Sequence, residues 1–567
     1  MAVASDSAQA LGLPTTATPL RAVVDAALAH DHDAAHVDEL AIPMRDGIHL
    51  AADVHLPPAA QRPAPAVVFG TPYDKSASKL GALEAEVLQR AGYVVVDYDC
   101  RGRGKSEGDW RAFVNDADDG HDVVEWVAGQ PWCTGDVAVS GLSYGGWITW
   151  ATASTRPPHL KAMISTSPAG RWMQEIPYTW GCFQLYFANW VAAVERRLTT
   201  NPTFDVDRAV QTLPIADIEA LIDPVGRTWR DMLEHDTLDD FWLALRYDDR
   251  YHEIDVPVLH VTGWHDREDI QGAFHHYEHM VAASPARDRQ WLVVGPWSHV
   301  MCRWPGNEYG GETYDASASV DMHALHLRFL DRFLRAEDNG FDDEPRVRLF
   351  DTGADRWTTP KAWAAGTVEH VLYPGVDGAL ADDPPSDGAR EYRYDPADPP
   401  TYAFALDGIW EPPLDLHALV ERHDVLTFTT DPLTEPVTVH GWSFLDLLAT
   451  TDGDDTDWFV NLADVGEDGR SLRVAGGCLR ASYRASLSSP EPVPAGEPVR
   501  YRVELTPALH TFRRGHRIRM TLTSAEFPWF ARSLNRFGPI GDQAEPRVAH
   551  NTVHLGAGAT RLLLARG

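Results

Sequence analysis

The feature that most constrains this chain is the pattern Gly141-x-Ser143-x-Gly145, which stands between a short apolar β-type run and a helix-like segment. In this pattern the serine occupies a sharp strand-to-helix turn, and its hydroxyl projects from strained backbone. The flanking positions must be small to avoid clashes. The helix that follows directs its N-terminal amides toward developing negative charge. A glycine- and serine-rich turn without chemistry is the alternative, but the flanking strand and helix favour a catalytic nucleophile.

Length and composition limit the possible classes of protein. The chain has 567 residues, too many for one core, so we expect two or three domains. The formal net charge of −34 argues against nucleic acid or an anionic membrane as a partner. The sequence has no run of 18 apolar residues and no convincing signal peptide, so we expect a cytoplasmic protein. Five well-separated cysteines without a Cys-x-x-Cys pair suggest neither a zinc site nor a disulfide framework.

The pattern of expected strands and helices changes along the chain. Residues 1–35 are interpreted as a loose N-terminal lead-in. Strand-like and helix-like segments alternate over residues 36–169 and 252–345, which predicts a largely parallel α/β sheet. The alternation stops over residues 170–251, where helical and aromatic residues dominate, so this part is interpreted as an inserted helical cap. Residues 346–567 contain short alternating strands separated by turns, which predicts an all-β sandwich or jelly roll.

A serine nucleophile needs a base and a group that orients the base. Where an elbow serine is followed first by an acid and then by a histidine, each is expected at the C-terminal end of a strand. Asp266 and His299 satisfy this order, since each follows an apolar strand-like run. Asp269 is a rival for the orienting role, but Asp266 is nearer the strand end.

The tetrahedral intermediate of acyl transfer needs two hydrogen-bond donors for its oxyanion. The backbone N–H of Tyr144, the residue after Ser143, is one candidate. The phenol of Tyr73, which ends the strand-like run before the first long helix, is the other candidate. A packed loop tyrosine is the alternative for Tyr73.

Five stretches resemble the cocaine esterase-like hydrolases, a superfamily that also includes α-amino acid ester hydrolases, glutaryl cephalosporin acylases and X-prolyl dipeptidyl peptidases. They are GTPYDK (70–75), CRGRGKSEGDW (100–110), QPWCTGDVAVSGLSYGGW (130–147), GWHD (263–266) and GPWSH (295–299). Matching stretches toward the C-terminus are RHDVLTFTTDPL (422–433), DTDWFVNLADVGEDGRS (455–471) and FPWFARSLN (527–535). The resemblance implies an α/β-hydrolase domain with an inserted helical cap, followed by an all-β jelly-roll domain. It also implies Ser143, Asp266 and His299 as the triad, with Tyr73 and the Tyr144 amide as oxyanion donors.

The run Asp266-Arg267-Glu268-Asp269 resembles the α-amino acid ester hydrolases, in which two extra carboxylates near the site hold a substrate α-ammonium. A third carboxylate of that family lies in the cap, and alignment places Ile176 there, with Glu175 one residue away. The candidate substrate-binding residues are therefore Glu268, Asp269, Glu175 and the cap residue Trp172. The alternative for Glu268 and Asp269, slightly favoured by the sequence, is capping of the helix that follows them.

His275 and His279 lie four residues apart on an expected helix and could bind a metal. No third ligand is evident in the sequence, so surface or packing roles are favoured and no metal is expected.

These observations predict a cofactor-free serine hydrolase that cleaves esters or activated amides of small acyl groups through an acyl-enzyme on Ser143. Transfer of the acyl group to a nucleophile other than water is compatible with this chemistry. The expected partner is a small-molecule ester or amide, with no nucleic acid and no membrane, and a homo-oligomer is left open. The alternatives are an X-prolyl or aminoacyl exopeptidase and a catalytically silent binding protein.

Overall fold

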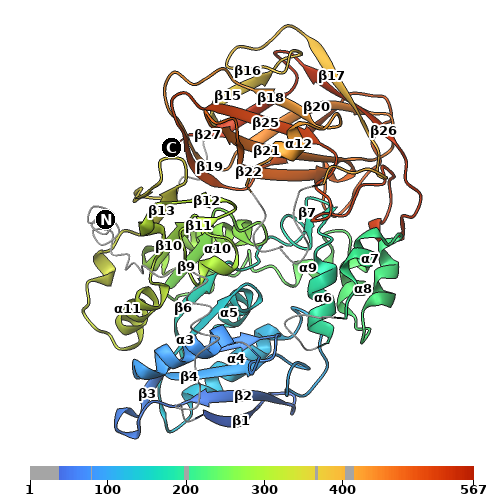
Figure 1. The fold of residues 1–567 in the computed structure, drawn as a ribbon. Coiled ribbons are helices and arrows are strands. Elements are labelled where there is room, and N and C mark those ends of the chain that lie inside the picture. Colours follow the sequence, from blue (N-terminus) through green and yellow to red (C-terminus); the bar gives the residue numbers. More distant parts are fainter. Residues whose placement is uncertain (1–36, 78, 197–202, 364–367, 402–413, 567) are drawn as a thin grey trace.

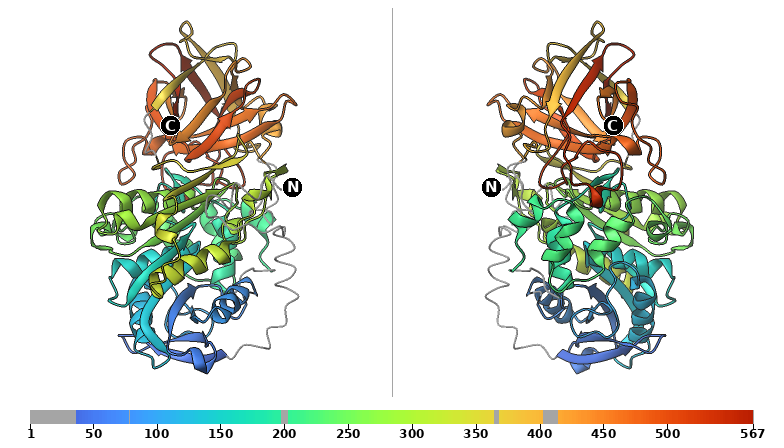
Figure 2. Two further views of the ribbon diagram at one scale, coloured as in Figure 1. Left: turned by 90° about the vertical axis from the view of Figure 1, so that its left-hand side faces the viewer. Right: turned by 90° about the vertical axis from the view of Figure 1, so that its right-hand side faces the viewer.

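The computed structural model describes residues 37–77, 79–196, 203–363, 368–401 and 414–566. The N-terminal lead-in expected over residues 1–35 lies outside the described residues. The chain forms two stacked bodies, a layered α/β body and a C-terminal body of strands, with a group of short helices at one side between them (Figure 1). The two side views show the same stacking along one long axis (Figure 2).

A ten-stranded sheet forms the centre of the α/β body. The strands from β4 to β13 in the spatial order run parallel, and the pairs at the two edges are antiparallel. Parallel strands covered on both faces are built from continuous apolar runs, as in the fully buried β9 and β10. In spatial order the strands are β1 (Val37–Pro43), β2 (His49–His55), β4 (Val94–Asp99), β3 (Ala64–Thr71), β5 (Cys133–Leu142), β6 (Leu160–Thr166), β9 (Val258–Gly263), β10 (Gln290–Gly295), β13 (Val347–Asp351) and β14 (Arg356–Thr358).

Helices cover both faces of this sheet. On one face α3 (Lys79–Arg90) packs against α11 (Met322–Leu334). On the other face lie α4 (Asp116–Ala128), α5 (Tyr144–Ser154) and α10 (Ile270–Ala283), and α5 is buried along its whole length. In the part of the chain that the structure describes, no helix combines the length and the apolar character needed to cross a membrane.

The last two strands of the sheet correct the expected domain boundary. β13 pairs in parallel with β10, and β14 pairs with β13, so the α/β sheet extends beyond residue 346. The sequence prediction failed at this point because both strands are short, alternate with turns and are followed, among the described residues, by further strands rather than a helix. They therefore look like the β region that comes next.

The chain between β6 and β9 leaves the sheet and forms the group of short helices, which is called the cap below. Its core is aromatic, and Trp172, Trp229 and Trp242 are almost completely buried there. The elements of the cap are β7 (Tyr178–Thr179), β8 (Cys182–Phe183), α6 (Phe187–Glu195), α7 (Val206–Gln211), the 3-10 helix η2 (Ile215–Leu221), α8 (Thr228–Glu234) and α9 (Asp240–Leu243).

The C-terminal body is all-β and confirms the predicted fold class, an α/β-hydrolase domain with an inserted cap followed by a jelly-roll domain. Its larger sheet contains, in spatial order, β16 (Leu380–Ala381), β15 (Val368–Pro374), β27 (Arg561–Ala565), β20 (Phe444–Thr451), β26 (Ala549–Leu555) and β17 (Gly388–Tyr394), with β23 (Val499–Glu504) paired to β20. The smaller sheet contains β18 (Leu426–Thr429), β25 (Arg517–Thr523), β21 (Asp457–Val465) and β22 (Ser471–Arg480), while β19 (Val437–Gly441) pairs with β24 (Ala508–Phe512). β22 contacts β7 and β8 of the cap, so the smaller sheet faces the cap.

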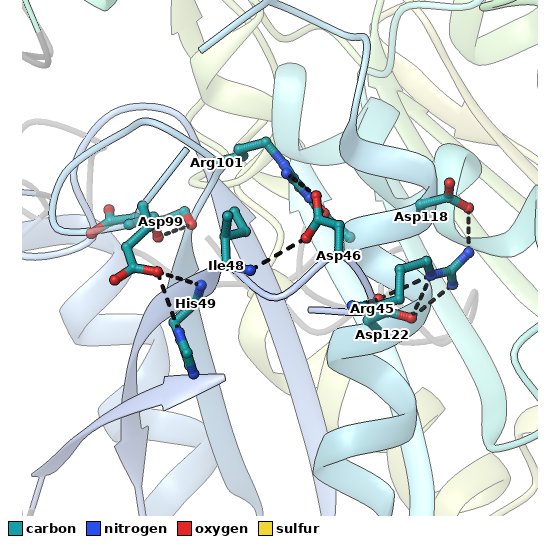
Figure 3. A network of polar contacts seen from close by, with 11 residues as sticks. Arg45, Asp46, Ile48, His49, Asp99, Arg101, Asp118 and Asp122 are labelled. Atoms are coloured by element: carbon teal, nitrogen blue, oxygen red, sulfur yellow. Dashed lines mark hydrogen bonds and ion pairs between the residues drawn. The ribbon is translucent and has the colours of Figure 1, made fainter. Parts of the chain in front are cut away.

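A polar network joins the turn between β1 and β2 to helix α4 (Figure 3). The guanidinium of Arg45 lies 2.8 Å from Asp118 and 2.7 Å from Asp122. Arg101, which follows β4, lies 2.5 Å from Asp46 in the same turn. Each exposed pair contributes at most about 1 kcal/mol, but together they hold the first half of α4 in place. The position of α4 matters because its first residue contacts the turn that carries Ser143.

Candidate active site

Ser143 lies at the junction of β5 and α5, with φ 61° and ψ −125°. This left-handed conformation is strained for a residue with a side chain and must be held by its surroundings. The close approach explains the glycines, since a Cβ on Gly141 would lie 2.2 Å from the backbone of Gly145. A Cβ on Gly146 would lie 2.6 Å from the carbonyl oxygen of Thr166. The turn therefore has the backbone geometry expected of a nucleophile elbow.

The side chain of Tyr144 points away from the elbow. Its hydroxyl donates a hydrogen bond of 2.7 Å to Asp116 at the start of α4, and it accepts one of 2.7 Å from the backbone N–H of Phe113. The ring is buried and stacks on Phe113 at 4.6 Å between centroids. Only the backbone amide of Tyr144 can therefore serve the site, and it belongs to the first turn of α5, where N–H groups have no partner within the helix.

Asp266 and His299 follow two neighbouring parallel strands, β9 and β10, and so lie at the same edge of the sheet. His299 Nδ1 lies 3.1 Å from each carboxylate oxygen of Asp266. Both side chains are buried. The contact fixes the plane of the imidazole and leaves Nε2 on the opposite side of the ring for proton transfer.

Tyr73 lies just beyond the end of β3, the neighbour of β5 in the sheet. Its hydroxyl accepts a bond of 3.0 Å from the indole N–H of Trp190 in the cap, and the Ser143 side chain is near enough to lower its pKa slightly. Burial raises the pKa of Tyr73, and the carboxylates of Glu268 and Asp269 act in the same direction. The phenol therefore stays protonated at neutral pH and can donate a hydrogen bond.

Glu268 and Asp269 do not cap helix α10 with their side chains. Asp269 is the residue at the N-cap position, but its side chain accepts no capping hydrogen bond. The backbone N–H groups of Glu268 and Asp269 instead donate to Oδ1 of Asp266, at 3.0 and 3.2 Å. Asp269 Oδ1 is buried and has no hydrogen-bond partner within the described residues. The capping alternative is therefore wrong, since neither side chain bonds the first turn of α10.

Glu268 and Asp269 flank the catalytic candidate histidine. Glu268 Oε2 lies 3.8 Å from His299 Nε2, and one ligand atom each of Glu268, Asp269 and His299 lie within 4.8 Å of one another. Burial raises the pKa of Glu268 to about 7, although the charge of His299 opposes the shift. Burial also raises the pKa of Asp269 well above its usual value. Several buried carboxylates in contact are costly to ionise together because their negative charges repel one another. A bound cation offsets this repulsion, so such a group attracts cations.

Glu175 is the third carboxylate of this group, whereas Ile176, which the alignment placed at this position, carries no charge. Glu175 is buried and receives backbone N–H bonds from Gly170 at 3.1 Å, from Arg171 at 3.2 Å and from Gly272 of α10. Burial raises its pKa to about 7. Its charge also raises the pKa of Asp269, so the two carboxylates are close enough to interact.

The jelly-roll domain supports the loop that carries these acids. Arg267 Nη2 lies 2.6 Å from Glu526 Oε2, and both side chains are buried. The guanidinium of Arg267 also stacks over the ring of Trp529 at 5.1 Å. A cavity of about 30 Å³ beside the loop is lined by residues of both bodies, including Glu175, Glu268 and Trp529. Sequence reasoning missed this contact because nothing in the sequence joins residues 259 positions apart.

Trp172 is a member of the cap core rather than a visible part of the substrate pocket. It is 1% exposed, its indole N–H donates to the carbonyl of Leu245 at 3.0 Å, and its ring stacks on Trp242 at 5.2 Å. The expectation that Trp172 binds substrate is not supported by this position. Another cap tryptophan, Trp190, reaches Tyr73, and no sequence signal distinguished it from its aromatic neighbours.

Two family descriptions match the chain in succession. Residues 46–301 match the X-Pro dipeptidyl-peptidase (S15 family), and residues 339–564 match the X-Pro dipeptidyl-peptidase C-terminal non-catalytic domain. Cocaine esterase of Rhodococcus sp. (strain MB1 Bresler) is 30% identical over 567 residues, which cover 91% of this chain and 95% of the esterase. The chain belongs to the family of hydrolases that includes cocaine esterase. The chain is therefore a hydrolase of this cocaine esterase family.

Solved structures extend the similarity over the whole fold. An α-amino acid ester hydrolase superposes with a TM-score of 0.85 and is 27% identical, with 98% of each chain covered. An aminopeptidase from a marine sediment archaeon (Thaumarchaeota archaeon) superposes with a TM-score of 0.84 and is 26% identical, with 94% of this chain and 97% of that chain covered. The cocaine esterase family fold therefore accounts for both bodies of the molecule and for their arrangement.

Proposed function

We propose that this member of the cocaine esterase family cleaves esters or activated amides of small acyl groups through an acyl-enzyme on Ser143. The observation that carries the proposal is that four strand ends lie at one edge of the sheet, where the strained Ser143 is close to the phenol of Tyr73 and His299 is oriented by Asp266. Serine catalysis requires a nucleophile, a base and an orienting group in this kind of arrangement.

The reaction follows from the positions of these groups. His299 Nε2 accepts the Ser143 proton while the serine oxygen attacks the acyl carbonyl. The backbone N–H of Tyr144 and the phenol of Tyr73 stabilise the oxyanion. His299 then gives the proton to the leaving group. Water, or another nucleophile in an acyl-transfer reaction, releases the acyl group by the same steps in reverse.

The test of the nucleophile combines covalent labelling with substitution. A fluorophosphonate should label Ser143, and Ser143→Ala should lower kcat by about 10⁴-fold or more while the fold remains intact. Ser154→Ala is the matched control, because Ser154 lies at the other end of the same helix and its hydroxyl donates a hydrogen bond to the carbonyl of Ala151. Labelling at another residue, or more than a tenth of the activity in purified Ser143→Ala, would overturn the proposal. Failure of the wild-type protein to react at all would favour a silent binding protein.

We further propose that the preferred acyl group carries an α-ammonium. The support is the group of buried carboxylates formed by Glu268, Asp269 and Glu175, of which Asp269 Oδ1 has no partner among the described residues. A charge-assisted hydrogen bond to a cation contributes about 1.5–3 kcal/mol. The likeness to an α-amino acid ester hydrolase and to an aminopeptidase points to the same kind of substrate.

The α-ammonium proposal is tested with two esters of nearly equal shape, the methyl esters of phenylglycine and of phenylacetic acid. Changing Glu268→Gln together with Asp269→Asn should lower kcat/KM for the phenylglycine ester by about ten- to a hundredfold. The uncharged ester should be affected little. If the ratio of the two kcat/KM values does not move, these residues do not recognise an amino group and the enzyme is a general carboxylesterase.

An X-prolyl exopeptidase is the second candidate, favoured by the family descriptions that match both bodies. It requires a free amino terminus two residues before the cleaved bond. Glycyl-prolyl p-nitroanilide and phenylalanyl p-nitroanilide separate the two proposals, because only an X-prolyl exopeptidase cleaves the first faster than the second.

A further inference from the structure

Three side chains outside the candidate active site meet at the junction of the cap and helix α10. His275 and His279 lie one helical turn apart on α10, with their ring centroids 4.0 Å from each other. Asp248, from the cap segment after α9, places Oδ1 at 2.7 Å from His275 Nε2. One ligand atom of each residue lies within 4.8 Å of the other two. The third ligand that the sequence did not reveal is therefore present, 27 positions before His275.

The contacts around the two histidines prepare them as ligands. His279 Nδ1 lies 2.8 Å from the carbonyl oxygen of His275, so this nitrogen carries the proton and Nε2 presents its lone pair. His275 is buried, and its contact with Asp248 fixes the plane of the ring. The second carboxylate oxygen of Asp248 accepts a hydrogen bond of 2.6 Å from Arg246. Protein metal ligands are commonly oriented by outer hydrogen bonds of this kind.

We propose that Asp248, His275 and His279 bind a divalent transition-metal cation of the zinc type through one carboxylate oxygen and two imidazole nitrogens. Two bonds of about 2.0–2.1 Å in tetrahedral geometry separate ligand atoms by about 3.3 Å, so Asp248 must move outward by about half an ångström. This is a small change for a side chain that is 34% exposed. Its exposure also lets water complete the coordination. The proton on His275 Nε2 moves to Nδ1 when the metal binds, so this histidine releases no net proton.

The types of ligand set the metal preference. The group offers two imidazole nitrogens and one carboxylate, whose second oxygen is bonded to Arg246. This is too few oxygen ligands for hard cations such as Ca²⁺ and Mg²⁺. Imidazole nitrogens prefer Zn²⁺, Cu²⁺, Ni²⁺ or Co²⁺. The site should therefore take a metal from the second group and reject the first.

The position of the site gives it a structural rather than a catalytic consequence. Helix α10 begins directly after Asp269, and at a rise of about 1.5 Å per residue His275 and His279 lie about 9 and 15 Å along it from Asp269. A metal here would join the cap to the helix that continues from the acid-bearing loop. Metal binding to the folded protein alone should raise the melting temperature by several degrees at saturating metal.

The test begins with the full chain freed of metal by a chelator. Equilibrium dialysis against Zn²⁺ should load one equivalent at this site, and Asp248→Asn and His279→Gln should each lose it. His235→Gln is the matched control, because His235 pairs with Asp239 at 2.6 Å with the same four-residue spacing but is not part of a three-ligand group among the described residues. The Tm should rise with Zn²⁺ in the wild type and the control, and should not respond to Ca²⁺ or Mg²⁺.

Two further measurements separate this site from the carboxylates at His299, which could also bind a cation. The double variant Glu268→Gln with Asp269→Asn should keep the equivalent that His279→Gln loses. Cu²⁺ bound to the wild-type protein should give an electron paramagnetic resonance spectrum with two imidazole nitrogens, which does not depend on the stability of any variant. No bound equivalent, no imidazole coordination, or loss of binding in the double variant alone would overturn the proposal.

Discussion

The indole N–H of Trp190 lies 3.0 Å from the hydroxyl oxygen of Tyr73 and donates a hydrogen bond to it. Because the oxygen accepts this bond, the phenolic proton is directed elsewhere, and the Ser143 side chain also lies near this hydroxyl. A residue of the cap thus sets the direction in which the candidate oxyanion donor points.

Trp190→Phe should remove this orientation and lower kcat by about fivefold, because a typical net hydrogen bond contributes about 1 kcal/mol and 1.4 kcal/mol corresponds to a factor of ten. KM should change little, since the contact acts on the transition state. In a Tyr73→Phe background the same substitution should have no further effect on kcat. Steady-state kinetics of the four proteins measure this coupling.

The control for Trp190 is Trp229→Phe, which removes another buried indole of the cap whose N–H donates to the carbonyl of Ile215 at 3.2 Å. It should leave kcat unchanged. Equal losses in the two single variants, or additive losses of Trp190→Phe and Tyr73→Phe, would show that Trp190 acts through the packing of the cap.

The carboxylates should also set the pH dependence of the reaction. Burial lowers the pKa of His299, but the charges of Asp266, Glu268 and Asp269 outweigh it and raise the pKa. Only neutral His299 can act as a base, so the acidic limb of kcat/KM for an uncharged ester should lie above the usual histidine pKa. Glu268→Gln removes one stabilising charge and should move this limb to lower pH by about one unit.

The measurement is kcat/KM for the methyl ester of phenylacetic acid as a function of pH. Glu278→Gln provides the control, because Glu278 lies on α10 and accepts indole hydrogen bonds from Trp363 and Trp442, which a glutamine oxygen can also accept. An acidic limb that is the same in Glu268→Gln and in wild type would mean that Glu268 does not affect the base.

The same carboxylate should make stability depend on pH. The pKa of Glu268 is about 7 in the folded protein, above its ordinary value of 4.5, so the folded state binds this proton more tightly than the unfolded state. Its favourable contribution is complete below about pH 4.5 and is lost as the pH rises through about 7. The Tm of Glu268→Gln should therefore exceed that of wild type by a few degrees at pH 8. The difference should shrink at pH 5, and a difference that is larger at pH 5 would contradict this reasoning.

The buried pair Arg267–Glu526 should matter for both stability and catalysis. Glu526→Gln leaves the Arg267 guanidinium buried without its charge partner, which costs about 3–5 kcal/mol. The displaced Arg267 should also disturb Asp266 and lower kcat. Glu312→Gln is the matched control, since Glu312 pairs with Arg470 across the same two bodies but on the surface. The melting temperature and kcat of both variants test this prediction. Equal losses in Glu526→Gln and Glu312→Gln would show that the buried pair contributes no more than the surface pair.

The sequence predicts those parts of the site that depend on strand ends. Ser143, Asp266 and His299 each follow an apolar run, and parallel strands bring their carboxyl ends to one edge of the sheet. The fold class is confirmed for the same reason, because the alternation of strands and helices dictates a parallel sheet. The roles of these residues in catalysis remain predictions that the variants above test.

The rest depends on contacts that no local pattern encodes. Trp190 meets Tyr73 across 117 positions, and among the cap aromatics nothing marks it out. The acids before α10 have the composition of a helix cap, yet the backbone N–H of Gly272 in the first turn of α10 donates to Glu175 of the cap instead. Asp248 completes a group with His275 and His279 only because the cap folds back onto α10.

The contact of Arg267 with Glu526 and Trp529 has a consequence for building chimeras within the family. The loop between Asp266 and Asp269 is held by side chains of the C-terminal body. The two bodies are therefore not independent modules that can be exchanged freely. If a C-terminal body were exchanged between relatives, the residues at positions 526–530 would come from the donor protein. They would then contact the loop that carries the acids of the recipient protein. A chimera that keeps the native contact would need residues 526–530 and the loop from the same protein. Exchange of the C-terminal body alone could change the substrate preference without any substitution in the catalytic body.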